Sequence, residues 1–399
     1  MFIYADNAAT TSLSPAVLEE MLPYFKDYYG NPSSLYSLGQ KSTEAIVKAR
    51  ETVAKYLGAE PREIYFTSGG SEADNQAINT AAKIGANKGK KHIVSTAFEH
   101  HAVLHTLDKL RNEGYDITLL DVHENGIINP DELKAAIRDD TCLVSIMFAN
   151  NEIGTIQPIK EAGEICKEKG VLFHVDAVQA AGHLPINVKE LNIDFLAMSA
   201  HKIHGPKGSG VLYCKKSVPL VPLIEGGAQE RGKRAGTENV AGIVGLAKAL
   251  QDACDHMEEN SKHVSEMRDY IIAGLKKIPY SILNGDETNR LPGNINFCFE
   301  GIEGESMLLL LDDKGICSSS GSACTSGSLD PSHVLLAIGR PHEIAHGSLR
   351  LSLGEDITKE QADYIIKSVE EVVTYLRNMS PVWRDLEKGK AQHIIKEAN

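Results

Sequence analysis

The sequence predicts an α/β fold in which a mostly parallel seven-stranded sheet is sandwiched by helices, next to a smaller α+β domain. Three observations predict it: seven short apolar runs within residues 63–214, helix-period segments between several of them, and a change of pattern near residue 259. Strands that alternate with helices form mainly parallel sheets with both faces covered. Ligands of such sheets bind beyond the carboxyl ends of the strands, so we expect the functional residues there.

The predicted strands are apolar runs rich in β-branched and aromatic residues, which favour extended structure. They cover residues 63–68, 91–97, 116–122, 142–150, 171–178, 194–200 and 210–214. Segments with helical spacing of apolar residues lie between them, at residues 71–86, 101–114 and 159–170. Together these elements predict a large domain over residues 15–258.

The second part of the chain has a different order of elements. A long helix over about residues 259–278 precedes strand-like segments at 281–285, 293–299 and 348–354, and a last helix follows Asp356. We expect a small domain built from residues 1–14 and 259–380. Residues 381–399 read as a polar tail with a few apolar anchors.

Composition excludes several classes of protein. The net charge of −13 argues against direct nucleic-acid binding or binding to an anionic membrane, which usually needs a basic face. The N-terminus lacks the features of a signal peptide, and no run of about 20 apolar residues predicts a membrane span. The 7 cysteines form no C-x-x-C pair, so neither a disulfide framework nor a zinc ribbon is predicted, and a reducing cytoplasm is the expected location.

An aspartate and a lysine follow two of the predicted strands. Asp176 ends the strand VLFHVD, and Lys202 comes just after the strand DFLAMS. A lysine that forms a Schiff base and a carboxylate that keeps a pyridine nitrogen protonated are the groups that pyridoxal phosphate requires. A lone lysine or aspartate is more often a solvated loop residue. Because Lys202 lies between an apolar strand and glycines, we favour the cofactor site.

The segment TSGGSEADN, at residues 67–75, is a candidate phosphate cradle. Gly69, Gly70 and Ser71 stand between a strand and a helix, where backbone N–H groups and the helix dipole favour an anion. An ordinary turn with Ser71 as the N-cap explains the same pattern, and the two interpretations stay open. The glycines of GPKGSG are a poorer candidate for a nucleotide loop, because a strand rather than a helix follows them.

Histidines cluster after the second predicted strand. His100 stands at the opening of a helix, where it could stack on a cofactor ring and move protons. His101 and His105 have the i,i+4 spacing that a metal could use, but surface histidines are the simpler interpretation. We expect no intrinsic metal site.

Two further residues are candidates for the chemistry. Cys324 lies in a small-residue, polar loop that cannot bury it, which favours a reactive thiol over a packed one. Arg350 alternates with leucines in GSLRLSLG, so it points away from their face. A solvated strand residue and a clamp for a substrate carboxylate are comparable interpretations of this arginine.

Ordered motifs along nearly the whole chain resemble the NifS/IscS-type cysteine desulfurases, a family of class V aminotransferase-like, fold type I pyridoxal phosphate enzymes. They are YADNAATT, YGNPSSLYSLG, FTSGGSEADN, EHHAVL, NNEIGTIQPI, HVDAVQ, MSAHKIHGPKG, RAGTENV, SSSGSACTSGSLDPSHVL and AHGSLRLSLG. The family often has threonine at the position of Ser71, which keeps the hydroxyl.

The resemblance implies a role for each site residue. Lys202 is then the Schiff-base lysine, Asp176 the pyridinium partner, His100 the stacking residue and Cys324 the persulfide-forming nucleophile. The remaining expected cofactor ligands are Gln179, Gly70, Ser71, Asn151, Ser199, His201 and, from the second subunit of a homodimer, Thr237. Asn151 and Arg350 are expected to hold the substrate carboxylate.

The resemblance also implies substrate and partners. L-cysteine would be converted to L-alanine, with the sulfur passed from Cys324 to an iron–sulfur scaffold of the NifU/IscU type, where Cys324 could be a transient metal ligand. The tail from Ser380 resembles the scaffold-docking end of the family. Alternatives are a selenocysteine lyase, a class V aminotransferase, or a non-catalytic sulfur carrier that kept the fold.

Overall fold

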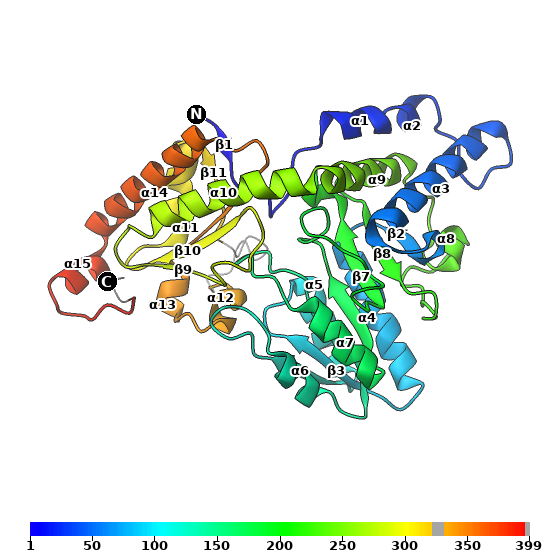
Figure 1. The fold of residues 1–399 in the computed structure, drawn as a ribbon, viewed down its shortest axis with the longest axis horizontal. Helices are drawn as coiled ribbons and strands as arrows, with labels where there is room; N and C mark the ends of the chain where they lie inside the picture. The colour runs from blue at the N-terminus through cyan, green and yellow to red at the C-terminus, as the bar shows by residue number, and fades with distance from the viewer. Residues whose placement is uncertain (321–330, 396–399) are drawn as a thin grey trace.

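The computed structural model describes residues 1–320 and 331–395. A seven-stranded sheet has the order β2-β8-β7-β6-β5-β3-β4 and lies at the centre of the larger part (Figure 1). Its strands are β2 (Ile64–Thr67), β3 (His92–Thr96), β4 (Asp116–Leu120), β5 (Thr141–Ser145), β6 (Leu172–Asp176), β7 (Phe195–Ser199) and β8 (Gly210–Cys214). Strand β8 runs antiparallel to β2 and β7, and the other pairings are parallel. The predicted mostly parallel, seven-stranded sheet is confirmed.

Helices cover both faces of this sheet, because neighbouring residues of each strand point into separate cores. Helices α4 (Gly70–Ala86) and α5 (His101–Asn112) pack on the face that carries Ile93 and Leu143. Helices α3 (Ser37–Leu57), α7 (Ile159–Lys169) and α9 (Val240–Asp255) contribute to the core that contains Val94 and Val144. The remaining helices of this part are α1 (Pro15–Met21), α2 (Pro23–Lys26), α6 (Pro130–Ala136) and α8 (Gln229–Gly232).

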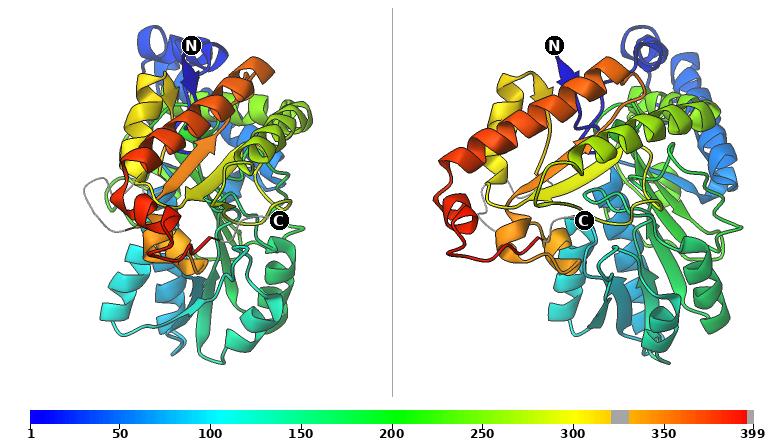
Figure 2. Two further views of the ribbon diagram at one scale, coloured as in Figure 1. Left: turned by 90° about the vertical axis from the view of Figure 1, so that its left-hand side faces the viewer. Right: turned by 60° about the vertical axis from the view of Figure 1, so that its left-hand side comes forward.

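The smaller part has a three-stranded antiparallel sheet with the order β12-β10-β9. These strands are β9 (Ser281–Leu283), β10 (Asn294–Phe299) and β12 (Ser348–Ser352). Helices α10 (Met257–Leu275) and α14 (Lys359–Met379) lie side by side against it (Figure 2), and α11 (Gly304–Asp313) packs on α14. The N-terminal strand β1 (Ile3–Tyr4) pairs with β11 (Ile316–Cys317), so the first residues share the core of this part.

The C-terminal stretch packs against the smaller part. Helix α15 (Pro381–Glu387) starts at Ser380, whose Oγ accepts a hydrogen bond from Trp383 N at 3.2 Å. The Trp383 ring is buried beside Tyr280, with ring centroids 5.5 Å apart, and the His393 ring stacks on Tyr280 at 3.6 Å. An apolar residue of the tail, Trp383, thus anchors it to the smaller part, as expected for a tail with a few apolar anchors. Two short helices, α12 (His333–Ala337) and α13 (His342–Ala345), complete the described elements.

No helix among the described residues is both long and apolar enough to cross a membrane.

Candidate active site

A cavity of about 360 Å³ opens where the central sheet meets the smaller part. This volume is within the range of small-molecule and cofactor sites. The predicted residues that line it are Gly70, Ser71, His100, Asn151, Asp176, Gln179, Ser199, His201, Lys202 and Arg350. The structure thus brings together ten residues that the sequence places over a span of 281 positions.

Asp176 and Lys202 face the cavity from neighbouring parallel strands. Asp176 is the last residue of β6 and pairs with Ala197 of β7. Lys202 ends a single 3₁₀ turn, η2 (Ala200–Lys202), that follows β7 directly. Its Nζ donates hydrogen bonds to the backbone oxygens of Ala8 at 2.6 Å and Ala9 at 2.8 Å. The N-terminal segment therefore fixes the position of the lysine amine.

The carboxyl groups beneath the cavity are buried together. Asp176 Oδ1 accepts a hydrogen bond from Val178 N at 2.9 Å. Burial raises the pKa of Asp176, but nearby His100 and Lys202 oppose this rise. Burial raises the pKa of Asp74 well above its usual value, and the neighbouring carboxyl groups of Asp176 and Glu99 raise it further. Asp74 is therefore the carboxyl of this pair that holds a proton more readily, whereas Asp176 has His100 and Lys202 to favour its charged form.

Asp74 also lies 3.3 Å from a histidine, measured from its Oδ1 to His174 Nε2. Complete burial lowers the pKa of His174 to about 3. This ring is therefore neutral at ordinary pH, and it supplies no positive charge to the carboxyl pair.

The N-terminus of α4 forms one wall of the cavity. The helix begins at Gly70, and its N-cap is Gly69 without a side-chain cap. The interpretation of Ser71 as the N-cap is therefore wrong, since Ser71 lies inside the first turn. A Cβ at Gly70 would stand 2.5 Å from Val178 Cγ2, so only glycine fits here. The N–H groups of this first turn have no partner within the helix and favour an anion.

His201 lies beside this wall and is hydrogen-bonded to the N-terminal segment. Its Nδ1 lies 3.2 Å from Thr10 Oγ1. Burial and the nearby Lys202 lower the pKa of His201 to about 4, so the ring is neutral. A neutral imidazole here can take part in hydrogen bonding without adding charge.

His100 stands at the opening of a helix as predicted, and it is the N-cap residue of α5. Its Nδ1 accepts a hydrogen bond from Ala102 N at 3.1 Å, which orients the ring toward the cavity that it lines. The rings of His101 and His105 lie 4.9 Å apart between centroids. Across residues 1–320 and 331–395, no group of three or more His, Cys, Asp or Glu side chains is arranged to hold a metal ion.

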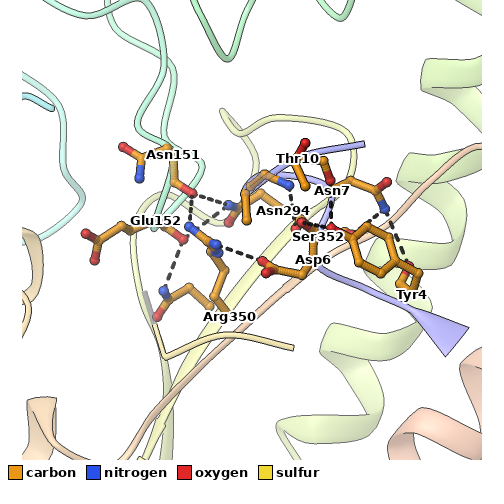
Figure 3. Close-up of polar contacts among 12 residues, drawn as sticks. Tyr4, Asp6, Asn7, Thr10, Asn151, Glu152, Asn294, Arg350 and Ser352 are labelled. Carbon is orange, nitrogen blue, oxygen red and sulfur yellow. Dashed lines mark hydrogen bonds and ion pairs between the residues drawn. The ribbon is translucent and has the colours of Figure 1, made fainter. Parts of the chain in front are cut away.

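Arg350 lies in β12 and is almost fully buried, so its interpretation as a solvated strand residue is wrong. Its Nη2 donates to Asp6 Oδ1 at 2.8 Å, and its Nη1 donates to the backbone oxygen of Asn151 at 3.1 Å (Figure 3). A buried guanidinium at the wall of a cavity can bind a carboxylate through charge-assisted hydrogen bonds.

Glu152, next to Asn151, is a buried carboxyl that the sequence did not single out. Burial raises its pKa to about 7, although Ser332 donates a hydrogen bond to Oε2. Ser332 is also the N-cap of α12. The segment that carries Asn151 is thereby tied to the start of α12.

The chain matches the family model described as aminotransferase class-V over residues 3–365. It belongs to this family. "Cysteine desulfurase IscS" of Clostridium botulinum is 56% identical over 98% of this chain and 99% of its own length. "Cysteine desulfurase IscS" of Methanosarcina thermophila is 58% identical over 95% of this chain and 94% of its own length. Within the class-V family, the chain is a member of the cysteine desulfurases.

Solved structures agree with this placement. A structure titled "NIFS-LIKE PROTEIN" superposes with a TM-score of 0.89 at 40% identity and covers 94% of this chain and 100% of its own. One titled "SspA in complex with cysteine" has a TM-score of 0.77 at 37% identity and covers 88% of this chain and 99% of its own. The fold type I assignment is confirmed.

One predicted residue of the desulfurase, Thr237, is not among the described residues that line the cavity. Thr237 is exposed, in the loop between α8 and α9, so its predicted role in the site of a second subunit stays a prediction. Cys324 lies outside the described residues.

Sequence reasoning missed the N-terminal contribution to the desulfurase site. Asp6 contacts Arg350, and the oxygens of Ala8 and Ala9 hold Lys202. These residues lie in the motif YADNAATT, which was used only for the family resemblance. No hydrophobic pattern indicates a backbone oxygen as a ligand, so only this motif could have pointed to the segment.

Proposed function

We propose that this protein removes sulfur from L-cysteine with the help of pyridoxal phosphate, leaving L-alanine and a persulfide on Cys324. The observation that carries the proposal is that one cavity holds a lysine amine, a buried carboxylate and a buried guanidinium. The curated relatives named cysteine desulfurase support the reaction. The solved relative described as a complex with cysteine supports the substrate.

The residues around the cavity fit pyridoxal phosphate by their chemistry. The N-terminus of α4 has no side-chain cap, so its backbone N–H groups can bind an anion. Glycine is required at position 70, because a Cβ there would be too close to Val178. Ser71 and Ser199 bring hydroxyl groups to the same cavity, and Asp176 brings a buried carboxyl group. The phosphate, the aldehyde and the pyridine nitrogen of the cofactor would thus each have a complementary group. These are the N-terminus of α4, the Lys202 amine and the Asp176 carboxyl group.

When bound, the cofactor withdraws electrons from the substrate carbon that is attached to the amine. Asp176 would keep the ring nitrogen protonated, and Gln179 would hydrogen-bond the phenolic oxygen. Lys202 would hold the cofactor through its amine and then take the α-proton of the substrate. His100 would transfer protons to and from the thiols, and Arg350 and Asn151 would hold the substrate carboxylate.

Sulfur transfer would use the Cys324 thiolate as the nucleophile. The thiolate would attack the substrate sulfur, forming a sulfur–sulfur bond while the carbon–sulfur bond breaks and its electron pair stays with carbon. Protonation of that carbon, together with the return of a proton to the α-carbon, would complete alanine. A reductant or an acceptor protein would then remove the persulfide sulfur.

The direct test measures alanine and sulfide released from L-cysteine in the presence of a reductant. We expect equal amounts of both products. Cofactor binding without sulfide, together with alanine formed from a keto acid acceptor, would instead favour an aminotransferase. Rapid turnover of selenocysteine with no turnover of cysteine would favour a selenocysteine lyase.

We also propose a homodimer in which Thr237 reaches the phosphate of the partner's site. Exposed apolar side chains are concentrated between residues 25 and 36, at Phe25, Tyr28, Tyr29, Leu35 and Tyr36. This segment borders the loop of Thr237, because Pro32, Ser33 and Glu238 line one common cavity. If these side chains form one patch, such an exposed apolar surface is typical of a protein interface.

Leu35 is 93% exposed, which makes it the sharpest test of the dimer. We expect Leu35→Asp to raise the dimer dissociation constant by at least about tenfold, because a charge in an apolar interface must be desolvated. Sedimentation at several protein concentrations measures this. Leu309→Asp is the matched control, since Leu309 is 73% exposed on α11 in the smaller part. Equal behaviour of the two variants would contradict the proposed interface.

We propose that the C-terminal stretch docks an iron–sulfur scaffold of the NifU/IscU type. Met379, Val382 and Ile394 are exposed there, whereas Trp383 is buried against the body. Deleting residues 381–399 should weaken scaffold binding and spare desulfuration. Because the deletion also uncovers Tyr280, Val382→Asp gives a second test that leaves the Trp383 contact in place. Unchanged scaffold affinity in both variants would refute the docking role.

A further inference from the structure

The Arg350 guanidinium is held by the protein at two of its three nitrogens. Nη2 donates to Asp6 Oδ1 at 2.8 Å, and Nη1 donates to the Asn151 oxygen at 3.1 Å. Nε is buried without a hydrogen-bond partner in the described part of the chain. These two nitrogens, together with the side chain attached at Nε, fix the plane of the guanidinium. Its orientation is therefore set before any ligand binds.

Asp6 is the charged member of this arrangement. Its carboxylate forms the only ion pair to Arg350 found within residues 1–320 and 331–395, and the arginine side chain is 3% exposed. A buried guanidinium without a counter-charge is strongly disfavoured, so this contact governs where the side chain settles. The Asn151 oxygen alone would leave the group free to turn about one hydrogen bond.

The backbone of Asp6 is itself fixed by β12, the strand that carries Arg350. Asp6 forms an isolated parallel bridge with Ser352, and Ser352 N donates to Ala5 O at 2.7 Å. Ser352 Oγ accepts from Ala8 N at 2.8 Å, and Asn7 Nδ2 donates to Ser352 O at 2.9 Å (Figure 3). The carboxylate is thus presented to Arg350 from a segment that cannot shift along the strand.

We infer that Asp6 is a positioning residue that aims the Arg350 guanidinium at the α-carboxylate of the substrate. The inference rests on the proposed function, in which Arg350 binds that carboxylate. It adds that the N-terminal segment sets the geometry of both ends of the substrate, since the oxygens of Ala8 and Ala9 hold the Lys202 amine two and three residues further along.

If Asp6 acts only by positioning Arg350, its removal should weaken substrate binding much more than it slows the chemical step. In Asp6→Ala the guanidinium loses its ion pair and its fixed plane, and we expect KM for L-cysteine to rise about tenfold or more while kcat changes less than about threefold. The inhibition constant of the product L-alanine should rise by the same factor. Asp6→Asn keeps an oxygen acceptor for Nη2 but removes the counter-charge, so its KM should lie between that of Asp6→Ala and that of the unmodified enzyme.

A ligand without a carboxylate distinguishes this role from general damage. Cysteamine matches cysteine except for the missing carboxylate, and we expect its inhibition constant to be unchanged in Asp6→Ala. Tyr4→Phe is the matched control for the segment, because the partners of Tyr4 Oη in the described part of the chain are the backbone oxygens of Asp6 and Thr10. The thermal midpoints of all variants show whether the fold is kept.

The inference is overturned if Asp6→Ala leaves KM within about twofold of the unmodified value, if Asp6→Asn is as impaired as Asp6→Ala, or if cysteamine weakens in step with alanine. Arg350→Ala identifies which idea has failed. A raised KM in Arg350→Ala with no change in Asp6→Ala sinks the role of Asp6 alone. No change in either variant sinks the proposed carboxylate site as well.

Discussion

Lys202→Ala should reduce alanine and sulfide formation from L-cysteine by at least about 10⁴-fold, the upper end of what a positioned acid or base contributes. The expectation follows from two functions that the same amine would perform, holding the cofactor and taking the α-proton. The amine has no substitute in the cavity among the described residues, since Lys202 is the one lysine that lines it. Borohydride should attach the cofactor covalently to the unmodified protein and not to this variant.

Lys207→Ala is the control for this prediction. Lys207 lies in the same loop, is exposed and does not line the cavity, so its removal should leave the rates nearly unchanged. Lys202→Ala also loses two hydrogen bonds to the N-terminal segment, and a thermal melt must show that it stays folded. Substantial turnover in a folded Lys202→Ala protein would contradict the assignment.

Cys324→Ala should lower sulfide release by at least about 10³-fold, because no other thiol would accept sulfur from the substrate. Cofactor binding should be unaffected, since the cofactor ligands proposed above do not include Cys324. Mass spectrometry after brief exposure to cysteine should find an added sulfur on the unmodified protein and none on the variant.

Cys317→Ala is the matched control for the thiol. Cys317 ends β11 shortly before Cys324 in the sequence and is partly buried, and burial raises its pKa, so its thiol is a poor nucleophile. We expect full activity in this variant. Loss of sulfide in Cys317→Ala with normal release in Cys324→Ala would exchange the two roles.

The central sheet could be predicted from sequence because its strands are short runs rich in apolar, β-branched and aromatic residues. Strand β8 coincides with its predicted residues, and β3 lies within one residue of its prediction at each end. The segment 142–150 was predicted as one long strand, but β5 ends at Ser145. Residues 146–150 are buried and apolar up to Asn150, so composition alone could not distinguish an irregular buried segment from a strand.

Much of the site could also be predicted, because residues with ionisable side chains follow strands whose carboxyl ends lie close together. Asp176 and Lys202 are the clearest case, as they end or follow neighbouring parallel strands. Asp6, Asp74 and Glu152 could not be found this way. Their importance comes from burial beside other charges, which depends on packing between segments far apart in the chain.

The contact between Asp6 and Arg350 joins residues 344 positions apart, and this fixes an order of events during synthesis. At about 5–20 residues per second, Asp6 is made roughly 17–70 seconds before Arg350. The central sheet and Lys202 are complete long before then. We therefore expect a nascent chain to reach a state that can hold the cofactor but cannot orient an amino acid, which would confine sulfur release to finished molecules.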